Sequence, residues 1–246
     1  MKNYKFTIQY DGSRYKGWEH QPGTDMTIQG KIENVLAKLE GRPVEVIGAG
    51  RTDAGVHAEA MIANARLSAA MSAKELKEYM NRYLPDDICI KDAAEASDRF
   101  HSRYNAVGKT YRYTCYIGGE KPVFDRKYVF ALEEEPDMQR MKEAAKILEG
   151  EHDFAGFCSN PRMKKSTVRK VDHIDISKKG DYLYFTYHGS GFLQHMVRIM
   201  TGTLLEVGFN KRSAESMLQL LSEKKRALAG ATAPAQGLCL IKVDYS

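Results

Sequence analysis

One short segment of the sequence, residues 48–57, has the residue types of a catalytic loop. It reads GAGRTDAGVH, so small residues surround a single carboxylate, Asp53, and Arg51 precedes it by two positions. Glycines let a substrate approach the backbone closely. A neighbouring arginine favours the ionised carboxylate, which is the form that acts as a nucleophile or a general base at neutral pH. The alternative is structural, because aspartate and glycine are also the common residues of turns.

Aromatic and basic residues occur together in a second segment, residues 100–113. Tyr111 and Tyr113 are two positions apart, so they point the same way if the segment is a strand. Arg103 and Lys109 lie nearby in the sequence. Aromatic rings beside cations are the components of a platform on which single-stranded or flipped bases stack. The alternative is that the alternating tyrosines face a core.

A third segment, residues 191–205, places an arginine in an otherwise apolar helical pattern. If Arg198 is buried it needs a partner, and a loop carboxylate such as Asp53 would be one. If it faces water at one turn of the helix, it needs none. His195, like His57 and His101, fits a structural or substrate-orienting role better than that of a general base.

Positive charge is concentrated in two stretches of a chain whose net charge is +5. Residues 99–112 contain four lysines and arginines and no acid. Residues 160–170 contain five, again with no acid, which equals the net charge of the whole chain. Such stretches are either solvated loops or parts of a face that binds a polyanion such as a nucleic acid.

Length and composition exclude several classes of protein. With 246 residues, 43% of them hydrophobic and 28% charged, the chain folds as one large or two small domains. No apolar run reaches the roughly 18 residues of a membrane span. The N-terminus alternates like a strand and has no secretory signal, so we expect a cytoplasmic protein.

Neither a metal nor a cofactor is expected. The four cysteines are scattered, without the paired spacing of a zinc site, and are interpreted as reduced structural thiols: Cys89, Cys115, Cys158 and Cys239. The sequence also lacks the glycine-rich motifs that bind dinucleotides or phosphates.

Strand and helix patterns alternate on both sides of these segments and must position them. Thr27 precedes a helical pattern that ends at Gly41, and Ser72 with Glu75 forms a capping box for a second helix. The patterns predict two α+β halves with a boundary near residues 104–108. In the second half, strands and helices are expected at residues 111–117, 138–148, 173–176, 182–188, 195–207, 213–228 and 238–245.

Taken together and in this order, the segments resemble the tRNA pseudouridine synthase A family. The resemblance extends nearly end to end, and its most specific part is GRTDAGVHA at residues 50–58. One departure is Glu19, where such proteins usually carry glutamine, and it puts a local RNA contact in doubt. The other matching segments are YDGSRYKGW, IQG, NRYLPDDI, FHSR, KTYRY, FLQHMVR and TAPAQGL, at residues 10–18, 28–30, 81–88, 100–103, 109–113, 192–198 and 232–238.

The resemblance implies a fold, an activity and partners. The fold is α+β, with two ferredoxin-like (RRM-like) domains, residues 1–105 and 106–246, whose antiparallel sheets join around a central basic cleft. The activity is isomerisation of uridine to pseudouridine at positions 38 to 40 of the tRNA anticodon stem-loop. Similar proteins are homodimers in which one tRNA contacts both subunits. No metal, cofactor or membrane is implied.

The resemblance also implies roles for individual residues. Asp53 is the catalytic carboxylate, which either attacks C1′ of the target nucleotide or removes a C2′ proton. Tyr111 stacks on the flipped base and assists proton transfer at C5, while Arg198 pairs with Asp53 and keeps it ionised. Arg51 holds the bulge that the flipped nucleotide leaves. The remaining RNA-binding residues are Arg14, Lys16, Tyr10, Trp18, His57, Arg103 and Lys109.

Three alternative functions compete with this one. A non-catalytic RNA-binding module on the same fold has no reason to retain both Asp53 and Arg198. A nucleosidase usually shows two carboxylates, and this loop offers one. A paralogue that modifies other uridines, or another RNA, stays open.

Overall fold

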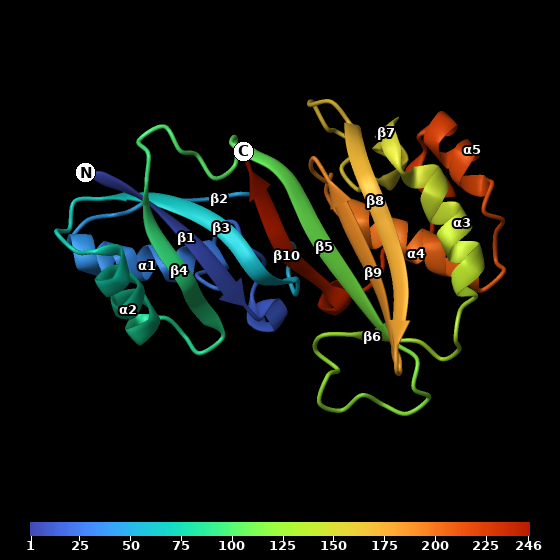
Figure 1. Cartoon of the computed structure of the whole chain (residues 1–246), viewed down its shortest axis with the longest axis horizontal. Coiled ribbons are helices and arrows are strands. Elements are labelled where there is room, and N and C mark those ends of the chain that lie inside the picture. The colour runs from blue at the N-terminus through green and yellow to red at the C-terminus, as the bar shows by residue number, and fades with distance from the viewer. The chain divides into compact units, whose positions relative to one another are not determined.

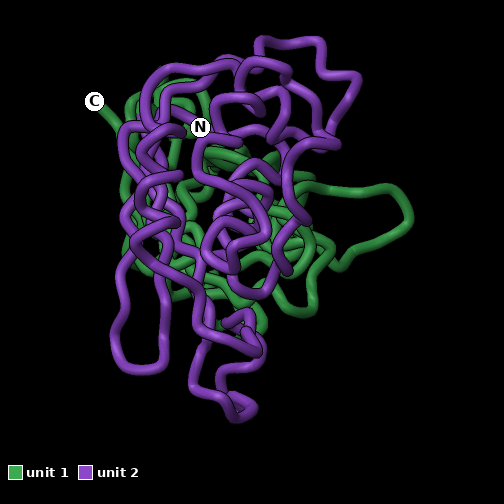
Figure 2. Tube along the Cα trace, turned by 90° about the vertical axis from the view of Figure 1, so that its right-hand side faces the viewer, with its two compact units in different colours: residues 1–107, 239–246 green, residues 108–238 purple.

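The structure, a computed structural model, describes residues 1–246 and combines strands with five α-helices (Figure 1). The α+β class expected from the sequence is therefore confirmed. Two sets of contacts divide the chain into a first unit, Met1–Val107 with Cys239–Ser246, and a second unit, Gly108–Leu238 (Figure 2). The division follows the expected boundary within a few residues, but the last strand lies with the first unit. The domain assignment 1–105 and 106–246 stays a prediction.

The sheet of the first unit has the strand order β4-β1-β3-β10, with β2 beside β3. β1 pairs with both β3 and β4 in antiparallel orientation, whereas β10 lies parallel to β3. Alternate residues of β1 are buried, which agrees with the predicted pattern. The strands are β1 Lys2–Tyr10, β2 Val46–Gly48, β3 His57–Leu67, β4 Ile88–Ala96 and β10 Leu238–Tyr245.

Two helices of the first unit, α1 (Ile28–Glu40) and α2 (Ala73–Tyr83), begin at the residues that the sequence indicated, and α1 also ends where it was expected to end. The Thr27 side chain accepts a hydrogen bond from the Gly30 backbone, and Gly41 ends α1 with a φ of 67°. The Ser72–Glu75 capping box is formed at the start of α2. Both predictions of helix ends are confirmed.

The sheet of the second unit has the strand order β5-β9-β8-β7, and all these neighbours are antiparallel. The short strand β6 pairs with β5 in parallel. Three helices lie on one side of this sheet (Figure 1). The elements are β5 Ala106–Tyr116, β6 Phe130–Ala131, α3 Met138–Leu148, β7 Gly150–Asp153, β8 Val168–Lys179, β9 Tyr182–Gly189, α4 Met196–Gly208 and α5 Ser216–Glu223.

The last helix is shorter than its sequence pattern. The apolar spacing predicts helix over residues 213–228, but α5 ends at Glu223 because Lys224 adopts a left-handed conformation with a φ of 57°. A separate 3₁₀ turn follows over Arg226–Leu228. The chain contains no helix with both the length and the apolar character of a membrane span. All four cysteines are free thiols.

Candidate active site

Asp53 lies in the turn that connects β2 to β3 and is half-buried. The turn closes on itself, because the Val56 amide donates to the Asp53 carbonyl oxygen at 3.1 Å. Gly55 follows with a φ of 80°, a conformation that favours glycine. The sequence offered a turn and a catalytic loop as alternatives for this segment. The structure forms a turn that carries the single carboxylate, Asp53.

Thr52, the residue before Asp53, is held through both its backbone and its side chain. The Trp18 amide donates to the Thr52 carbonyl oxygen at 3.0 Å, and the Tyr10 hydroxyl hydrogen-bonds to Thr52 Oγ1 at 2.8 Å. Gly17 passes so close that a Cβ there would lie 2.6 Å from the same carbonyl oxygen. The backbone beside Asp53 is therefore fixed by the last residue of β1 and the segment that follows it.

Three of the residues expected to contact RNA are buried beneath this turn. Tyr10, Trp18 and His57 are only 3%, 2% and 5% exposed. The Trp18 ring lies against Gly48, where a Cβ would be 2.5 Å from it, and His57 Nδ1 accepts from the Gly12 amide at 3.1 Å. In this structure these side chains join the two segments of the site and support the turn.

The four cations of the first unit that were predicted to bind RNA are exposed, and two of them are ion-paired. Arg51 Nη1 lies 2.9 Å from Glu19 Oε2, the position where the sequence departs from the family pattern. Arg14 bonds to Asp87 at 2.7 Å. Lys16 and Arg103 are exposed.

Asp87 also accepts from the Tyr15 hydroxyl at 2.6 Å. Burial, together with this hydrogen bond, raises the pKa of Tyr15 to about 12, so its hydroxyl stays protonated over the physiological range. Asp87 therefore holds the two neighbouring side chains, Arg14 and Tyr15, at the end of the 3₁₀ turn Gly12–Arg14.

Tyr111 in β5 is 8% exposed and packs against an aromatic side chain to which the sequence assigned no role. Its ring meets that of Phe192 edge-on, with the centroids 5.4 Å apart and the planes at 89°. Edge-to-face pairs of this kind fix ring orientation. Phe192 lies in residues 191–205, the segment that the sequence analysis selected because of Arg198. The sequence did not indicate that Phe192 would contact Tyr111.

Arg198 lies in the first part of α4 and is half-buried. Its Nε donates to the Ala233 carbonyl oxygen at 2.8 Å, and the Ala233 amide donates to the Arg198 carbonyl oxygen at 3.1 Å. Tyr113 is fully buried, donates its hydroxyl to Pro234 O at 2.7 Å, and has a raised pKa because of burial. The C-terminal segment is thereby held against α4 and β5.

Lys109 is half-buried on β5, opposite Gly189 of β9. The second unit thus holds Lys109, Tyr111 and Arg198, whereas the first unit holds Asp53 and the remaining predicted residues.

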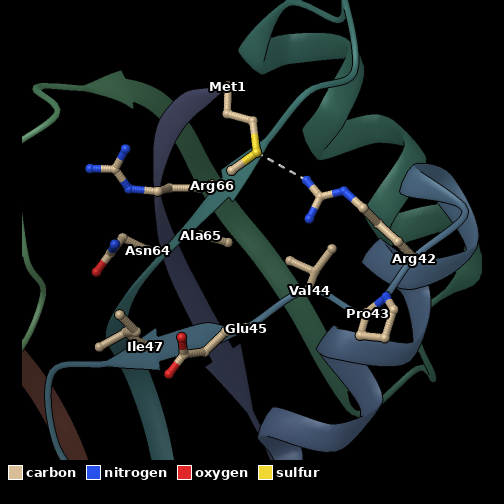
Figure 3. A pocket seen from close by; sticks show the side chains of 9 residues that line it. All are labelled: Met1, Arg42, Pro43, Val44, Glu45, Ile47, Asn64, Ala65 and Arg66. Carbon is tan, nitrogen blue, oxygen red and sulfur yellow. Dashed lines mark hydrogen bonds between the residues drawn. The ribbon is translucent and has the colours of Figure 1, made fainter.

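No group of three or more histidine, cysteine, aspartate or glutamate side chains is arranged to hold a metal ion. A cavity of about 300 Å³ opens elsewhere in the first unit (Figure 3). None of the candidate site residues contributes to its lining. It is lined by Met1, Arg42, Pro43, Val44, Glu45, Ile47, Asn64, Ala65 and Arg66.

Comparison with known proteins identifies similar chains over the full length. A family model described as tRNA pseudouridine synthase matches residues 7–105 and 144–246. The tRNA pseudouridine synthase A of Bacillus sp. (strain KSM-64) is 45% identical over 245 residues, covering 100% of both chains. The tRNA pseudouridine synthase A 1 of Clostridium tetani (strain Massachusetts / E88) is 42% identical over 245 residues, with the same coverage.

One solved structure, a Cbf5-Nop10-Gar1 complex, aligns with 97% of this chain and 49% of its own chain. The identity is 15% and the TM-score is 0.38.

Proposed function

Because this chain belongs to the tRNA pseudouridine synthase family and is an isomerase that makes pseudouridine in tRNA, we propose that its targets are uridines 38 to 40 of the anticodon stem-loop and that Asp53 is its catalytic carboxylate. The observation that carries the assignment of Asp53 is the fixed geometry of its turn. The preceding residue, Thr52, is held by three close contacts from the end of β1 and the segment that follows it. A reacting group needs this kind of support, because small displacements of it cost large factors in rate.

The reaction requires a bond exchange on the target nucleotide. The N1–C1′ bond breaks, the uracil turns within the site, and C5 bonds to C1′. The proton on C5 leaves to solvent, N1 gains a proton, and no oxidant or energy carrier is needed. The target base must first leave the stack, which costs about a few kcal/mol.

Asp53 acts at the sugar. It either attacks C1′ through an oxocarbenium-like state, as glycosidase carboxylates do, or removes a C2′ proton to give a glycal. Tyr111 stacks on the flipped base and assists proton transfer at C5. By resemblance, Arg198 is the cation that serves the Asp53 carboxylate. The half-burial of Arg198 and the fixed Tyr111 ring are consistent with these roles.

We divide the predicted RNA-binding residues into two groups. The first group is exposed and contacts phosphates: Arg14, Lys16, Arg51 and Arg103. Lys109, on the same strand as Tyr111, binds RNA next to that tyrosine. The buried Tyr10, Trp18 and His57 act on RNA through the loop that they support.

The salt dependence of tRNA binding tests Arg14 and Lys16. Replacing both by alanine weakens binding and lowers the slope of log affinity against log salt by about 1 to 2, because each phosphate contact releases counterions. The measurement is filter binding of tRNA at several KCl concentrations. As a matched control, Lys38→Ala with Lys74→Ala removes two exposed helix lysines and leaves the slope unchanged. An equal slope in both double variants refutes the assignment.

Breaking the Arg51–Glu19 ion pair is expected to strengthen tRNA binding, whereas the previous substitutions weaken it. Glu19→Gln releases Arg51 from its ion pair and strengthens tRNA binding by about 2- to 5-fold, since an exposed pair of this kind contributes less than about 1 kcal/mol. The double variant Glu19→Gln with Arg51→Ala removes the gain. Unchanged affinity in Glu19→Gln contradicts a role for Arg51 in RNA binding.

The finer architecture is also part of the proposal. We propose two ferredoxin-like domains whose sheets join around a basic cleft. The order β-α-β-β-α-β in residues 1–96, with β2 and β4 at opposite edges of the β4-β1-β3-β2 strands, supports this for the first unit. By resemblance, the enzyme is a cytoplasmic homodimer in which one tRNA contacts both subunits.

Release of tritium from tRNA labelled at uracil C5 tests the proposed chemistry. Purified protein is incubated with unmodified transcripts in excess EDTA, and label in the solvent is counted. We expect multiple turnovers without added metal. No release from tRNAs that nonetheless bind points to another RNA target or to a binding module, and the substrate RNA is then varied.

A further inference from the structure

The strongest uncompensated positive charge in the second unit lies on residues 159–170, the basic loop, which runs from the 3₁₀ turn Ala155–Phe157 into the first residues of β8. Arg162, Lys164 and Lys165 are exposed and make no ion pair. The other two cations are engaged locally: Lys170 pairs with Asp172 at 2.9 Å, and Arg169 donates to backbone carbonyls of the loop itself.

Both ends of the basic loop are hydrogen-bonded to one segment, residues 189–195, which connects β9 to α4. At the first end, the Ser159 amide donates to Gln194 O at 3.3 Å, and Ser159 Oγ bonds to His195 Nδ1 at 2.7 Å. At the second end, the Ser190 amide donates to Lys170 O at 3.0 Å, and the Lys170 amide donates to Ser190 Oγ at 3.3 Å. The loop is therefore built onto this segment rather than loosely attached to it.

The same segment carries candidate site residues. Phe192 holds the Tyr111 ring, and His195, with a φ of 60°, precedes the first turn of α4, which bears Arg198. The basic loop thus flanks Tyr111 and Arg198 within one unit. One side chain of the loop, Met163, packs toward the protein interior, with its Sδ 3.9 Å from Sγ of the buried Cys158. The three cations without an ion pair are exposed to solvent.

We propose that the basic loop binds RNA phosphates next to the target nucleotide, through Arg162, Lys164 and Lys165. The proposal rests on the proposed function in one respect, since it takes Tyr111 and Arg198 as parts of the site. Three exposed cations without carboxylate partners suit a polyanion, and phosphates are the groups that position a nucleic acid on a protein. The Ser159–His195 hydrogen bond connects the loop that makes the proposed phosphate contact to the start of α4.

The test is the salt dependence of tRNA binding by the triple variant Arg162→Ala, Lys164→Ala and Lys165→Ala. The slope of log affinity against log salt falls by about 2 to 3, and the affinity falls by about 10- to 100-fold at moderate salt. kcat/KM in tritium release falls in proportion. Ethylation interference on the bound tRNA shows that phosphates flanking the target nucleotide lose their effect in the variant.

Two controls accompany the triple variant. Lys164→Arg with Lys165→Arg preserves the charge and keeps the slope. Lys38→Ala, Lys74→Ala and Lys142→Ala together remove three exposed helix lysines and also keep the slope. A slope unchanged in the loop variant, or lowered equally in the helix variant, overturns the proposal. Binding that depends on the loop in a protein that releases no tritium instead overturns the proposed function and leaves the loop as an RNA contact.

Discussion

Asp53→Asn is expected to lower the rate of pseudouridine formation by on the order of 10⁴-fold, the size of loss seen when an enzyme is deprived of one reacting side chain. The amide has nearly the shape of the carboxylate but neither attacks C1′ nor accepts the C2′ proton. Binding of tRNA stays within about threefold, because phosphate contacts elsewhere hold the RNA. The measurement compares tritium release at saturating tRNA with filter binding of the same transcript.

Glu59→Gln provides the matched control. Glu59 is an exposed carboxylate on β3, close to Asp53 in sequence, and its replacement removes the same charge. We expect activity within about twofold of the unsubstituted protein. Retention of full activity by Asp53→Asn, or an equal loss in both variants, contradicts the catalytic role of Asp53.

Gly17→Ala is expected to produce the second large effect. Gly17 has a φ of 104°, and an added Cβ would lie 2.6 Å from the Thr52 carbonyl oxygen. To relieve that contact, Thr52 and with it the neighbouring Asp53 must move. We expect a loss of about 2–4 kcal/mol in the free energy of unfolding. If Asp53 is catalytic as proposed, a displacement of its turn by about 1 Å lowers kcat by about 10²-fold.

Gly23→Ala separates the clash from the backbone strain. Gly23 also has a positive φ, 80°, but nothing lies within 4 Å of a Cβ placed there. Gly23→Ala therefore lowers the free energy of unfolding by only about 1 kcal/mol, through backbone strain, and leaves kcat near that of the unsubstituted protein. Urea unfolding and tritium release are measured for both variants. Equal effects on kcat in the two would mean that contact between Gly17 and Thr52 does not position Asp53.

Local sequence signals predicted the helices better than the edge strands. Thr27, Gly41 and Ser72 mark helix ends through hydrogen bonds and backbone angles that depend only on nearby residues. β4, with the sequence ICIKDAAEA, carries charges and little alternation because it is an edge strand with one open side. The early end of α5 at Lys224 has no comparable local signal, since lysine rarely adopts a left-handed conformation.

The candidate site was predictable in its chemistry and not in its packing. The residue types around Asp53 indicated a loop with one carboxylate, and the structure forms that turn. Burial of Trp18 against Gly48, and the Tyr111–Phe192 pair, depend on residues distant in the chain. Alternation alone placed Tyr111 and Tyr113 on one face, where the structure has both side chains buried. The contacts from Ser159 and Lys170 to residues 189–195 are also tertiary.

The departure at Glu19 shows what one residue can add to a family pattern. Glutamine at that position is neutral, whereas Glu19 forms an ion pair with Arg51 at 2.9 Å. The sequence indicated that a local RNA contact was in doubt, and the structure identifies the cation concerned. The pair is exposed and therefore weak, so RNA that binds Arg51 as proposed would displace it at little cost.

The proposed function is conversion of uridine to pseudouridine at positions 38 to 40 by means of Asp53. Its most direct test is to map pseudouridines, by carbodiimide treatment and primer extension, on unmodified tRNA transcripts after incubation with the protein or with Asp53→Asn. We expect primer-extension stops at uridines within positions 38 to 40 for the unsubstituted protein and none for the variant. Stops only elsewhere in the tRNA, or the same stops with Asp53→Asn, would contradict it.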